Sequence, residues 1–307
     1  MTSDLDERLR RANAPAEEAL RLGPFYRGKM QTFPKCPVRG SEDLSIWYTP
    51  GVAAQSRAIH ANPDLVYEHT NKANHVAIVS DATRVLGLGD IGPLAGLPVM
   101  EGKALLFKVL GGVDATPLCL ATTDADELVR AVEMLAPSFG GVNLEDIAQP
   151  KCFDVLGRLR GALDIPVWHD DQEGTATVVL AGLQASLELV GKRLGALKLA
   201  LIGCGAANTA SYRLLVTAGA DPRGIVVCDR KGTLHAQRED EPELRARFPN
   251  KWRMCEETNG ERVVGGIREA LRGADACIAF SASGPNVIRP EWVKEMAPDA
   301  IVFACAN

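Results

Sequence analysis

The chain of 307 residues carries 34 Lys and Arg against 39 Asp and Glu, for a net charge of -5, and 46% of its residues are hydrophobic. It is long enough for two domains of ordinary size, and its apolar fraction is typical of globular proteins. Basic and acidic residues are interspersed, and no apolar run reaches the roughly 20 residues of a membrane helix, so we expect neither a nucleic-acid nor a membrane partner.

The N-terminus and the cysteines indicate a cytoplasmic protein. The first eleven residues are polar and charged, unlike a secretory signal. The 8 cysteines form no CxxC pair and no zinc spacing, and most of them lie in apolar segments. We therefore predict buried free thiols in a reducing compartment.

Residues 1–173 are predicted to form an α/β domain that begins with a helical arm. In the arm, residues 1–30, apolar residues recur every three or four positions, which favours a helix that packs in a dimer. Strands are predicted at residues 76–79, 104–109, 117–120 and 166–169, and helices at residues 124–135 and 150–159.

Residues 174–307 are predicted to form a doubly wound, parallel-sheet domain that binds a dinucleotide. The helix 175–190 is apolar on nearly every face, so we expect it to be buried between the two domains. From Leu197 the pattern becomes strand, glycine turn, helix and strand. Later strands are predicted at residues 276–280 and 300–304 and helices at residues 267–271 and 290–296, whereas the polar stretch 231–260 has no clear pattern.

The glycine turn reads Gly203-x-Gly205-x-x-Asn208 and follows a strand. The first glycine permits a tight turn, and the second lets the backbone approach a pyrophosphate at the start of the next helix, where Ala206 and Ala207 lie. Asn208 departs from the usual Gly or Ala at the third position, but the surrounding strand and helix pattern restores the prediction.

The strand after this turn ends in an acid 26 positions beyond Gly203. Asp229 is predicted to bind the ribose hydroxyls of NAD, whereas Arg230 and Lys231 behind it suit the 2′-phosphate of NADP. The residues therefore leave both NAD and NADP open.

Two acidic pairs follow predicted strands, Glu145-Asp146 and Asp170-Asp171. Adjacent acids usually lie on a solvated surface, but parallel strands deliver such residues to one edge of a sheet, where α/β proteins place their chemistry. Carboxylates converging there suit Mg²⁺ or Mn²⁺, and His169 beside them is more typical of packing than of zinc binding. A metal beside a redox nucleotide indicates metal-assisted oxidation of a hydroxy acid.

At this point the chain closely resembles the malic enzymes in their shorter bacterial form, from about Ser45 onward. The resemblance rests on six stretches in the same order, which are residues 47–53, 80–92, 98–103, 139–146, 169–176 and 304–307. It implies an oxidoreductase that converts L-malate to pyruvate and CO₂ with reduction of NAD or NADP, dependent on Mg²⁺ or Mn²⁺. A homodimer or larger homo-oligomer is expected.

The resemblance also implies roles for individual residues. Tyr48 matches the family's general acid, Lys103 matches its general base, and Asp170 matches the acid beside that lysine. Arg84 matches the arginine that meets the substrate carboxylate. The metal ligands are matched by Glu145, Asp146 and Asp171, and the cofactor contacts by residues 203–208 and Asn307. The chemistry agrees for Lys103, because a lysine desolvated near a metal can have a pKa low enough to accept the hydroxyl proton.

A second glycine cluster, Gly87, Gly89 and Gly92, has the look of a nucleotide turn. No strong helix former follows it and Pro93 interrupts it, so we expect a tight active-site loop carrying Arg84 rather than a second nucleotide site.

The chain departs from the family pattern in two places. Glu173 stands where bacterial relatives usually have His, and we expect it to add negative charge near the ion. The chain also stops at Asn307 where relatives continue, so the nucleotide-binding domain is expected to be C-terminally incomplete, with residues 300–305 as a partly unpaired edge strand. Three alternatives therefore stay open: oxaloacetate decarboxylation or malolactic conversion at the same site, and a non-catalytic protein that only binds nucleotide.

Overall fold

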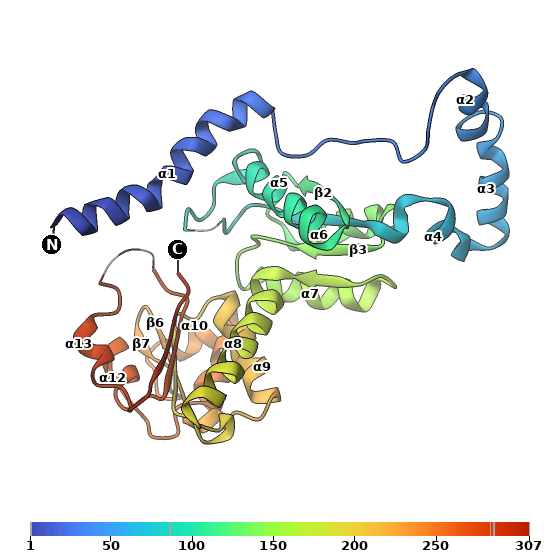
Figure 1. The fold of residues 1–307 in the computed structure, drawn as a ribbon. Helices are drawn as coiled ribbons and strands as arrows, with labels where there is room; N and C mark the ends of the chain where they lie inside the picture. Colours follow the sequence, from blue (N-terminus) through green and yellow to red (C-terminus); the bar gives the residue numbers. More distant parts are fainter. Residues whose placement is uncertain (1, 86, 283, 285, 307) are drawn as a thin grey trace.

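The computed structural model describes residues 2–85, 87–282, 284 and 286–306, and it contains two α/β parts that are each built around their own sheet (Figure 1). The first sheet has the order β2-β1-β3-β4 and is entirely parallel. Its strands are β1 (His75–Ser80), β2 (Asp114–Cys119), β3 (Gly141–Leu144) and β4 (Val167–His169).

Helices cover both faces of the first sheet. They are α5 (Gly92–Gly111), α6 (Ala125–Leu135) and α7 (Lys151–Ala162), with the short η3 (Ala136–Ser138) after α6. Met100 and Ala104 of α5 pack on Ile78, whereas α6 and α7 cover the opposite face with apolar residues such as Leu128 and Leu159. Because helices cover both faces, the strands carry apolar side chains on both sides, as expected for a parallel sheet.

Helix α5 corrects two predictions. Residues 104–109, predicted as a strand, belong to this helix, and Pro93 lies in its first turn, where a proline is well tolerated, instead of interrupting the segment. The helix ends at Gly112 with φ +68. Only one face of α5 is buried, while Leu106, Val109 and Leu110 are exposed. Because apolar residues occupy both faces, the helical period is hidden, and a short apolar run does not distinguish a strand from a helix.

The arm that precedes the first sheet extends away from it (Figure 1). Its elements are α1 (Thr2–Tyr26), α2 (Ser41–Trp47), α3 (Val52–Ala61), η1 (Pro63–Leu65), α4 (Val66–His69) and η2 (Asn71–Asn74). The predicted N-terminal helix is confirmed, and none of the residues from α2 to η2 is buried. Lys29 connects the arm to α5, since its Nζ donates to the Pro98 carbonyl at 3.0 Å.

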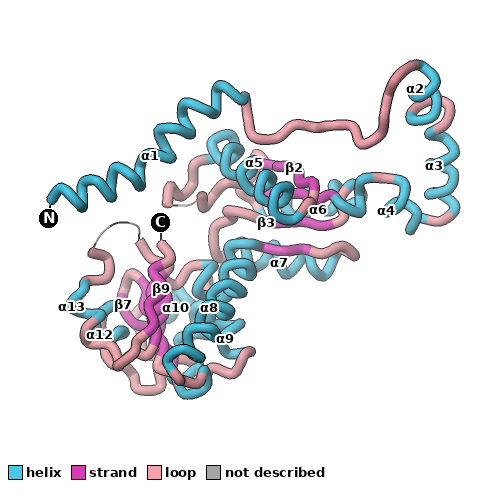
Figure 2. Tube along the Cα trace, in the orientation of Figure 1, coloured by secondary structure: helices cyan, strands magenta, loops and turns pink. Residues whose placement is uncertain are grey.

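The second sheet has the order β7-β6-β5-β8-β9 and is parallel except for the short β7. Its strands are β5 (Leu199–Ile202), β6 (Ile225–Asp229), β7 (Gly232–Thr233), β8 (Ala276–Ala279) and β9 (Ile301–Ala304). As expected, β9 forms one edge, and β8 is its only partner among the described strands. Figure 2 shows the strands lying between helical layers.

The helices of the second part account for the stretch that had no clear pattern. They are α8 (Thr175–Val190), α9 (Ala206–Thr217), α10 (Glu241–Arg247), α11 (Pro249–Glu257), α12 (Ile267–Leu271) and α13 (Pro290–Val293), with η5 (Leu194–Ala196) and η6 (Pro222–Gly224). Residues of α8, α9 and α11 share one core with β5 and β6, and α12 packs on the other face. The fold class is therefore the predicted one, whereas the domain boundary at residue 173/174 stays a prediction.

Helix α8 is less buried than its sequence predicts. Val179, Leu183 and Leu187 pack into the second core, but Val178 and Leu189 are 72% and 89% exposed. The helix therefore contacts the second core with one face only, and the prediction that it is buried between the two domains is wrong for its exposed face. In the part of the chain that the structure describes, no helix combines the length and apolar character needed to cross a membrane.

Candidate functional site

The two acidic pairs lie beside each other at the carboxyl edge of the first sheet. Strands β3 and β4 are parallel neighbours with Leu144 opposite His169, so the residues that follow them emerge together. Asp170 and Asp171 open η4 (Asp170–Gly174), a single π-helical turn. The Asp171 carboxylate accepts a hydrogen bond of 2.8 Å from the backbone N–H of Asp146, which joins one pair to the other.

Lys103 reaches this edge from α5 and lies between one acid of each pair. Its Nζ is 2.7 Å from Oδ2 of Asp170 and 3.1 Å from Oε1 of Glu145. The second oxygen of Glu145 accepts from Nδ2 of Asn143 at 2.8 Å. Glu145 is almost fully buried, and Lys103 is largely so. The structure thus joins the predicted base, its neighbouring acid and one predicted metal ligand.

The charges of this cluster are strongly coupled. Burial and the neighbouring Asp171 raise the pKa of Glu145 to about 8, although Lys103 opposes the shift. Burial lowers the pKa of Lys103, but Glu145 and Asp170 outweigh it and raise that pKa above its ordinary value. With the protein's own groups alone Lys103 is therefore a cation, and the lowered pKa expected for a base is not obtained.

The donor atoms have the chemistry of a divalent-metal site but not its arrangement. The carboxylates of Asp170 and Asp171 lie close enough to Glu145 to raise its pKa, and carboxylate oxygens in such a buried, negative setting suit Mg²⁺ or Mn²⁺. Within the described residues, however, no three Asp, Glu, His or Cys side chains are placed to hold one ion. Lys103 supplies the positive charge instead, so the ligand roles of Glu145, Asp146 and Asp171 stay predictions.

His169 lies under the acidic edge as a packing residue. Its side chain is fully buried, and Nδ1 is 3.8 Å from Oδ2 of Asp171. Neither ring nitrogen has a hydrogen-bond partner among the described atoms. Burial lowers the pKa of this imidazole, which favours its neutral form.

The loop that carries Glu145 and Asp146 is braced by residues that sequence reasoning missed. Asp81, directly after β1, forms a buried ion pair with Lys151 and accepts from Thr83. Thr83 accepts in turn from the Ala148 N–H at 2.9 Å. The sequence contained one signal for this role: Asp81 comes just after a predicted strand, so it lies at the same carboxyl edge of the sheet as the two acidic pairs.

Arg84 belongs to the same bracing loop. Its backbone N–H donates to the Asp146 carbonyl at 3.0 Å, while its side chain is exposed. The residue predicted to meet the substrate carboxylate is therefore anchored beside the acids, and its guanidinium is accessible.

Tyr48 is not brought to this cluster within one chain. It follows α2, and its side chain is 72% exposed. In Figure 1, α2 and α3 lie apart from α5, the helix that carries Lys103. The predicted general acid is thus separate from Lys103.

The glycine turn of the second sheet has the geometry expected of a nucleotide site. Gly203 has φ +95, and an added Cβ would lie 2.2 Å from the Phe280 carbonyl oxygen. Gly205 has open space around the same position, and α9 begins directly after it with Ala206 and Ala207, whose N–H groups precede the first intrahelical bonds. A phosphate can therefore approach the backbone at Gly205.

Asn208 supports the turn from behind. Its side chain is fully buried, and Nδ2 donates to the carbonyls of Ile202 at 3.0 Å and Gly203 at 2.8 Å. This explains why an amide stands where glycine or alanine is usual. A direct contact between Asn208 and the cofactor stays a prediction, and Asn307 lies outside the described residues.

Asp229 ends β6 as predicted, but protein groups already engage its carboxylate. It accepts from the Lys231 N–H at 2.8 Å and from Arg238 at 3.0 Å, and it forms an ion pair with Lys251. Burial alone would raise the pKa of Asp229, but Lys251 and Arg238 lower it. The Lys231 side chain pairs with Asp240, whereas Arg230 is exposed and has no ion-pair partner among the described residues, so NAD and NADP both stay open.

Two further features bear on the site. The carboxylate of Glu173 forms a two-point pair with Arg160, at 2.7 and 2.5 Å, which compensates its charge locally, and its predicted effect on an ion stays a prediction. The second feature links the two parts, since Nε2 of Gln149 donates to the Cys204 carbonyl within the nucleotide turn at 3.1 Å.

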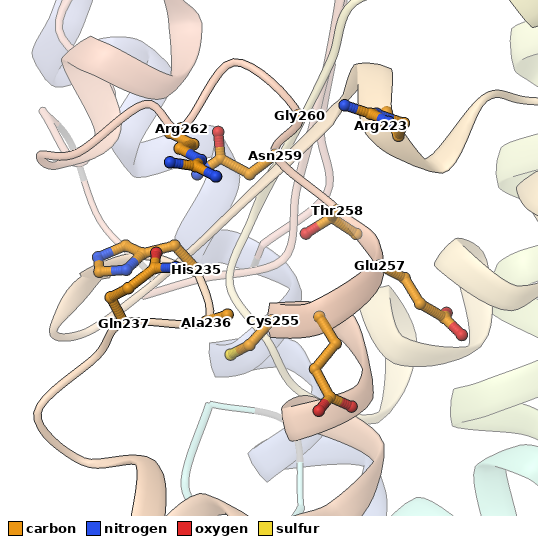
Figure 3. A pocket seen from close by; sticks show the side chains of 11 residues that line it. Arg223, His235, Ala236, Gln237, Cys255, Glu257, Thr258, Asn259, Gly260 and Arg262 are labelled. Carbon is orange, nitrogen blue, oxygen red and sulfur yellow. The ribbon is translucent and has the colours of Figure 1, made fainter.

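A cavity of about 350 Å³ in the second part is separate from this chemistry (Figure 3). Its lining includes His235, Gln237, Asn259 and Arg262. The N–H of Asn259 bonds the carbonyl of Ile225, at the start of β6, so the cavity lies at the end of the sheet opposite to the glycine turn. We assign it no part in the site.

Comparison with known proteins places this geometry in context. The family model described as "Malic enzyme, N-terminal domain" matches residues 27–125 and 120–160. An NAD-dependent malic enzyme of Geobacillus stearothermophilus is 48% identical over 91% of the chain and 56% of its own length. A bifunctional malic/malolactic enzyme of Bacillus subtilis is 46% identical over 95% of the chain and 69% of its own length. An NADP-dependent malic enzyme of Rhizobium meliloti is 42% identical over 95% of the chain and 37% of its own length.

Solved structures agree with these relatives. The malic enzyme of Entamoeba histolytica superposes with a TM-score of 0.92 at 47% identity, covering 97% of this chain and 62% of that one. The NAD-dependent malic enzyme of Thermotoga maritima has a TM-score of 0.86 at 42% identity, covering 94% and 74%. The chain thus spans a little over half the length of the Geobacillus relative and about three fifths of the Entamoeba structure.

Proposed function

The chain belongs to the malic enzyme family, and from this premise we propose that its site serves the oxidative decarboxylation of L-malate to pyruvate and CO₂ with reduction of NAD or NADP. The observation that carries the proposal is Lys103 held between Glu145 and Asp170, at the edge where the two acidic pairs meet. Relatives named NAD-dependent and NADP-dependent support a nicotinamide cofactor of either kind.

In this proposal, Glu145, Asp146 and Asp171 would hold Mg²⁺ or Mn²⁺, which when bound polarises the oxygen at C2 of the substrate. Lys103 takes the proton of the C2 hydroxyl as hydride leaves C2 for the nicotinamide. Lys103 can act as a base only when the charges of Glu145 and Asp170 are compensated, because those charges raise its pKa.

The remaining residues position the reactants. Arg84 receives a substrate carboxylate, and the backbone from Gly203 to Ala207 receives the pyrophosphate of the nucleotide. Asp170 holds Nζ of Lys103 at 2.7 Å and so sets the direction from which the proton is taken. After the oxidation, the C3–C4 bond of oxaloacetate breaks, CO₂ leaves, and the enolate of pyruvate must gain a proton at C3.

Tyr48 is the proposed donor of that proton. Because it lies on the exposed arm, away from the Lys103 of its own chain, we propose a homo-oligomer in which the arm of one chain completes the site of another. A mixture of inactive Tyr48→Phe and Lys103→Ala proteins should then recover activity, because a mixed dimer has one site with both an intact Lys103 and an intact Tyr48. Random dimers should reach about a quarter of the parent rate. No recovery after subunit exchange contradicts this arrangement.

The whole proposal is tested with malate, Mn²⁺ and each nucleotide separately, on this chain and on a version extended to the length of its relatives. NAD(P)H and pyruvate should form together, only with the metal, and Lys103→Ala should form neither. Stabilisation by nucleotide without any product in either version would support a protein that only binds nucleotide.

A second candidate activity has a specific observation in its favour, which is the 46% identity to the bifunctional malic/malolactic enzyme of Bacillus subtilis. Lactate production from malate without net NADH would indicate malolactic conversion. Release of CO₂ from added oxaloacetate, without nucleotide, would indicate simple decarboxylation at the same metal-dependent site.

A further inference from the structure

A cavity of about 520 Å³ lies behind the turn that carries Asp170 and Asp171. Its walls come from β4 and α7 of the first part, from α8 and α9 of the second part, and from the end of η4 between them. We call it the hinge pocket, and its lining includes Phe153, Gly157, Arg160, Trp168, Glu173 and Arg213. Asp170 and Asp171 at the start of η4 contact Lys103 and Asp146, whereas Gln172 and Glu173 line the pocket, so the two sites share one turn of backbone.

Arg213 gives the hinge pocket a positive charge without a counter-charge. Among the described residues it has no carboxylate within ion-pair distance; its one side-chain hydrogen bond is to Asn250, and its guanidinium lies 5.2 Å from the centre of the Phe153 ring. Arg160, by contrast, is fully matched by Glu173. The three ionised groups leave a net charge of +1, which suits a ligand with one negative charge.

The remaining walls of the hinge pocket are largely apolar. Phe153, Leu156 and Leu214 contribute side chains, and Trp168 is 41% exposed. The volume is within the range of about 300–1,000 Å³ typical of small-molecule sites, which combine apolar walls with a few polar groups. A flat aromatic body beside Trp168 with an acidic group at Arg213 matches these walls.

We propose that the hinge pocket binds a small organic monoanion with an aromatic body, and that the bound anion changes the affinity for the nucleotide. The reason for coupling is structural: α9 begins at the nucleotide turn, and Arg213 and Leu214 of the same helix line the pocket. A ligand that contacts α7 and α9 together favours one relative position of the two parts. By linkage, each ligand then changes the affinity for the other. The coupling rests on the proposed nucleotide function, whereas the binding of the anion does not.

Gly157 allows the pocket to be filled without disturbing the core. It lies in α7, and a Cβ added there meets nothing within 4 Å, so Gly157→Leu places a side chain in the cavity. Gly161 is the matched control, because it lies in the same helix, also has nothing within 4 Å of an added Cβ, and is outside the lining. Both substitutions replace a helical glycine, so both should raise thermal stability slightly, which verifies folding.

Binding is measured calorimetrically with naphthalene-2-carboxylate, and naphthalene-2-methanol serves as the uncharged probe. The parent and Gly161→Leu should bind the carboxylate with the same Kd, and Gly157→Leu should weaken it by about 10-fold or more. Arg213→Gln should weaken the carboxylate by about 10-fold while leaving the alcohol unchanged. Equal affinities for Gly157→Leu and Gly161→Leu, an equal loss of acid and alcohol in Arg213→Gln, or no saturable binding by about 1 mM would each overturn the proposal.

Coupling is measured from the fluorescence of NADH and NADPH with and without saturating naphthalene-2-carboxylate. The nucleotide Kd should shift by about 3-fold or more in the parent and in Gly161→Leu, and not in Gly157→Leu. An unchanged nucleotide Kd in the parent overturns the coupling. Binding of the anion by a protein that binds neither nucleotide instead contradicts the proposed function and supports the pocket itself.

Discussion

The two sheets both place their proposed site residues at the carboxyl ends of parallel strands, but they do so with different parts of the chain. At the first sheet the groups are side chains from α5, from the residues after β3 and from η4, and their charges depend on one another. At the second sheet the site is backbone, and it depends on the space left by Gly203 and Gly205. A change of charge should therefore affect the first site, and a change of volume the second.

The largest expected effect is at the first sheet. Lys103→Met removes the proposed base while keeping the length of the side chain, and malate turnover should fall by about 100- to 10,000-fold, measured as kcat. Lys108→Met on the same helix changes only a lysine that pairs with Asp114, and it should leave kcat near the parent value. A Lys103→Met protein that turns over malate as fast as the Lys108→Met protein would remove Lys103 from the mechanism.

Glu145 should make the stability of the chelator-treated protein depend on pH. Its pKa is raised from 4.5 to about 8 in the folded state, so the folded protein holds an extra proton between these values. The free energy of unfolding should therefore fall as pH rises from 4.5 to 8, by up to a few kcal/mol, and recover when Mn²⁺ is added at pH 8.

Denaturant unfolding at several pH values measures this effect. Glu145→Gln should flatten the dependence over the same range, because the amide does not titrate. A parent protein whose stability is constant or rises through this window would show that Glu145 is charged throughout.

Substitutions in the glycine turn separate volume from charge at the second sheet. Gly203→Ala forces a Cβ against the Phe280 carbonyl at a position with φ +95, so it should destabilise the fold by about 2–3 kcal/mol. Gly205→Ala has open space, so its unfolding free energy should stay within about 0.5 kcal/mol of the parent while nucleotide affinity falls by about 10-fold. Nucleotide binding by Gly205→Ala at the parent Kd would place the pyrophosphate elsewhere.

The smallest expected effect concerns the bond between the two regions. Gln149→Leu removes the hydrogen bond to the Cys204 carbonyl, which should cost about 1 kcal/mol and weaken nucleotide binding by about 5-fold. Titration with NADH or NADPH measures it, and Gln149→Glu, which lacks the donor, should behave similarly. If both variants match the parent, the two sheets are not coupled through this residue.

Sequence alone predicted the features that depend on local pattern. Strand ends followed by acids, and a glycine turn between a strand and a helix, placed Glu145, Asp171 and Gly203 correctly in the fold. Residues 104–109, which directly follow Lys103, were predicted as a strand although they belong to a helix, because apolar residues occupy both of its faces. Local periodicity does not show which apolar face of a segment packs against the sheet and which face stays exposed.

Other failures arose from contacts distant in the sequence. Glu173 was expected to add a free negative charge near the acids, but Arg160, 13 residues away, pairs with its carboxylate. The position of Tyr48 depends on an arm that contacts little of its own chain, and the pairing of Asp81 with Lys151 joins residues 70 positions apart. Such pairings follow from the packed structure and leave no periodic signal.

Asn208 has a consequence for how a dinucleotide meets this protein. Its amide donates to the carbonyls of Ile202 and Gly203, so the turn is already joined to α9 without a ligand, and such preorganisation reduces the conformational entropy lost on association. Sequence patterns that accept only glycine or alanine at the third position of this motif will miss turns that are held by side-chain hydrogen bonds instead of by close helix packing.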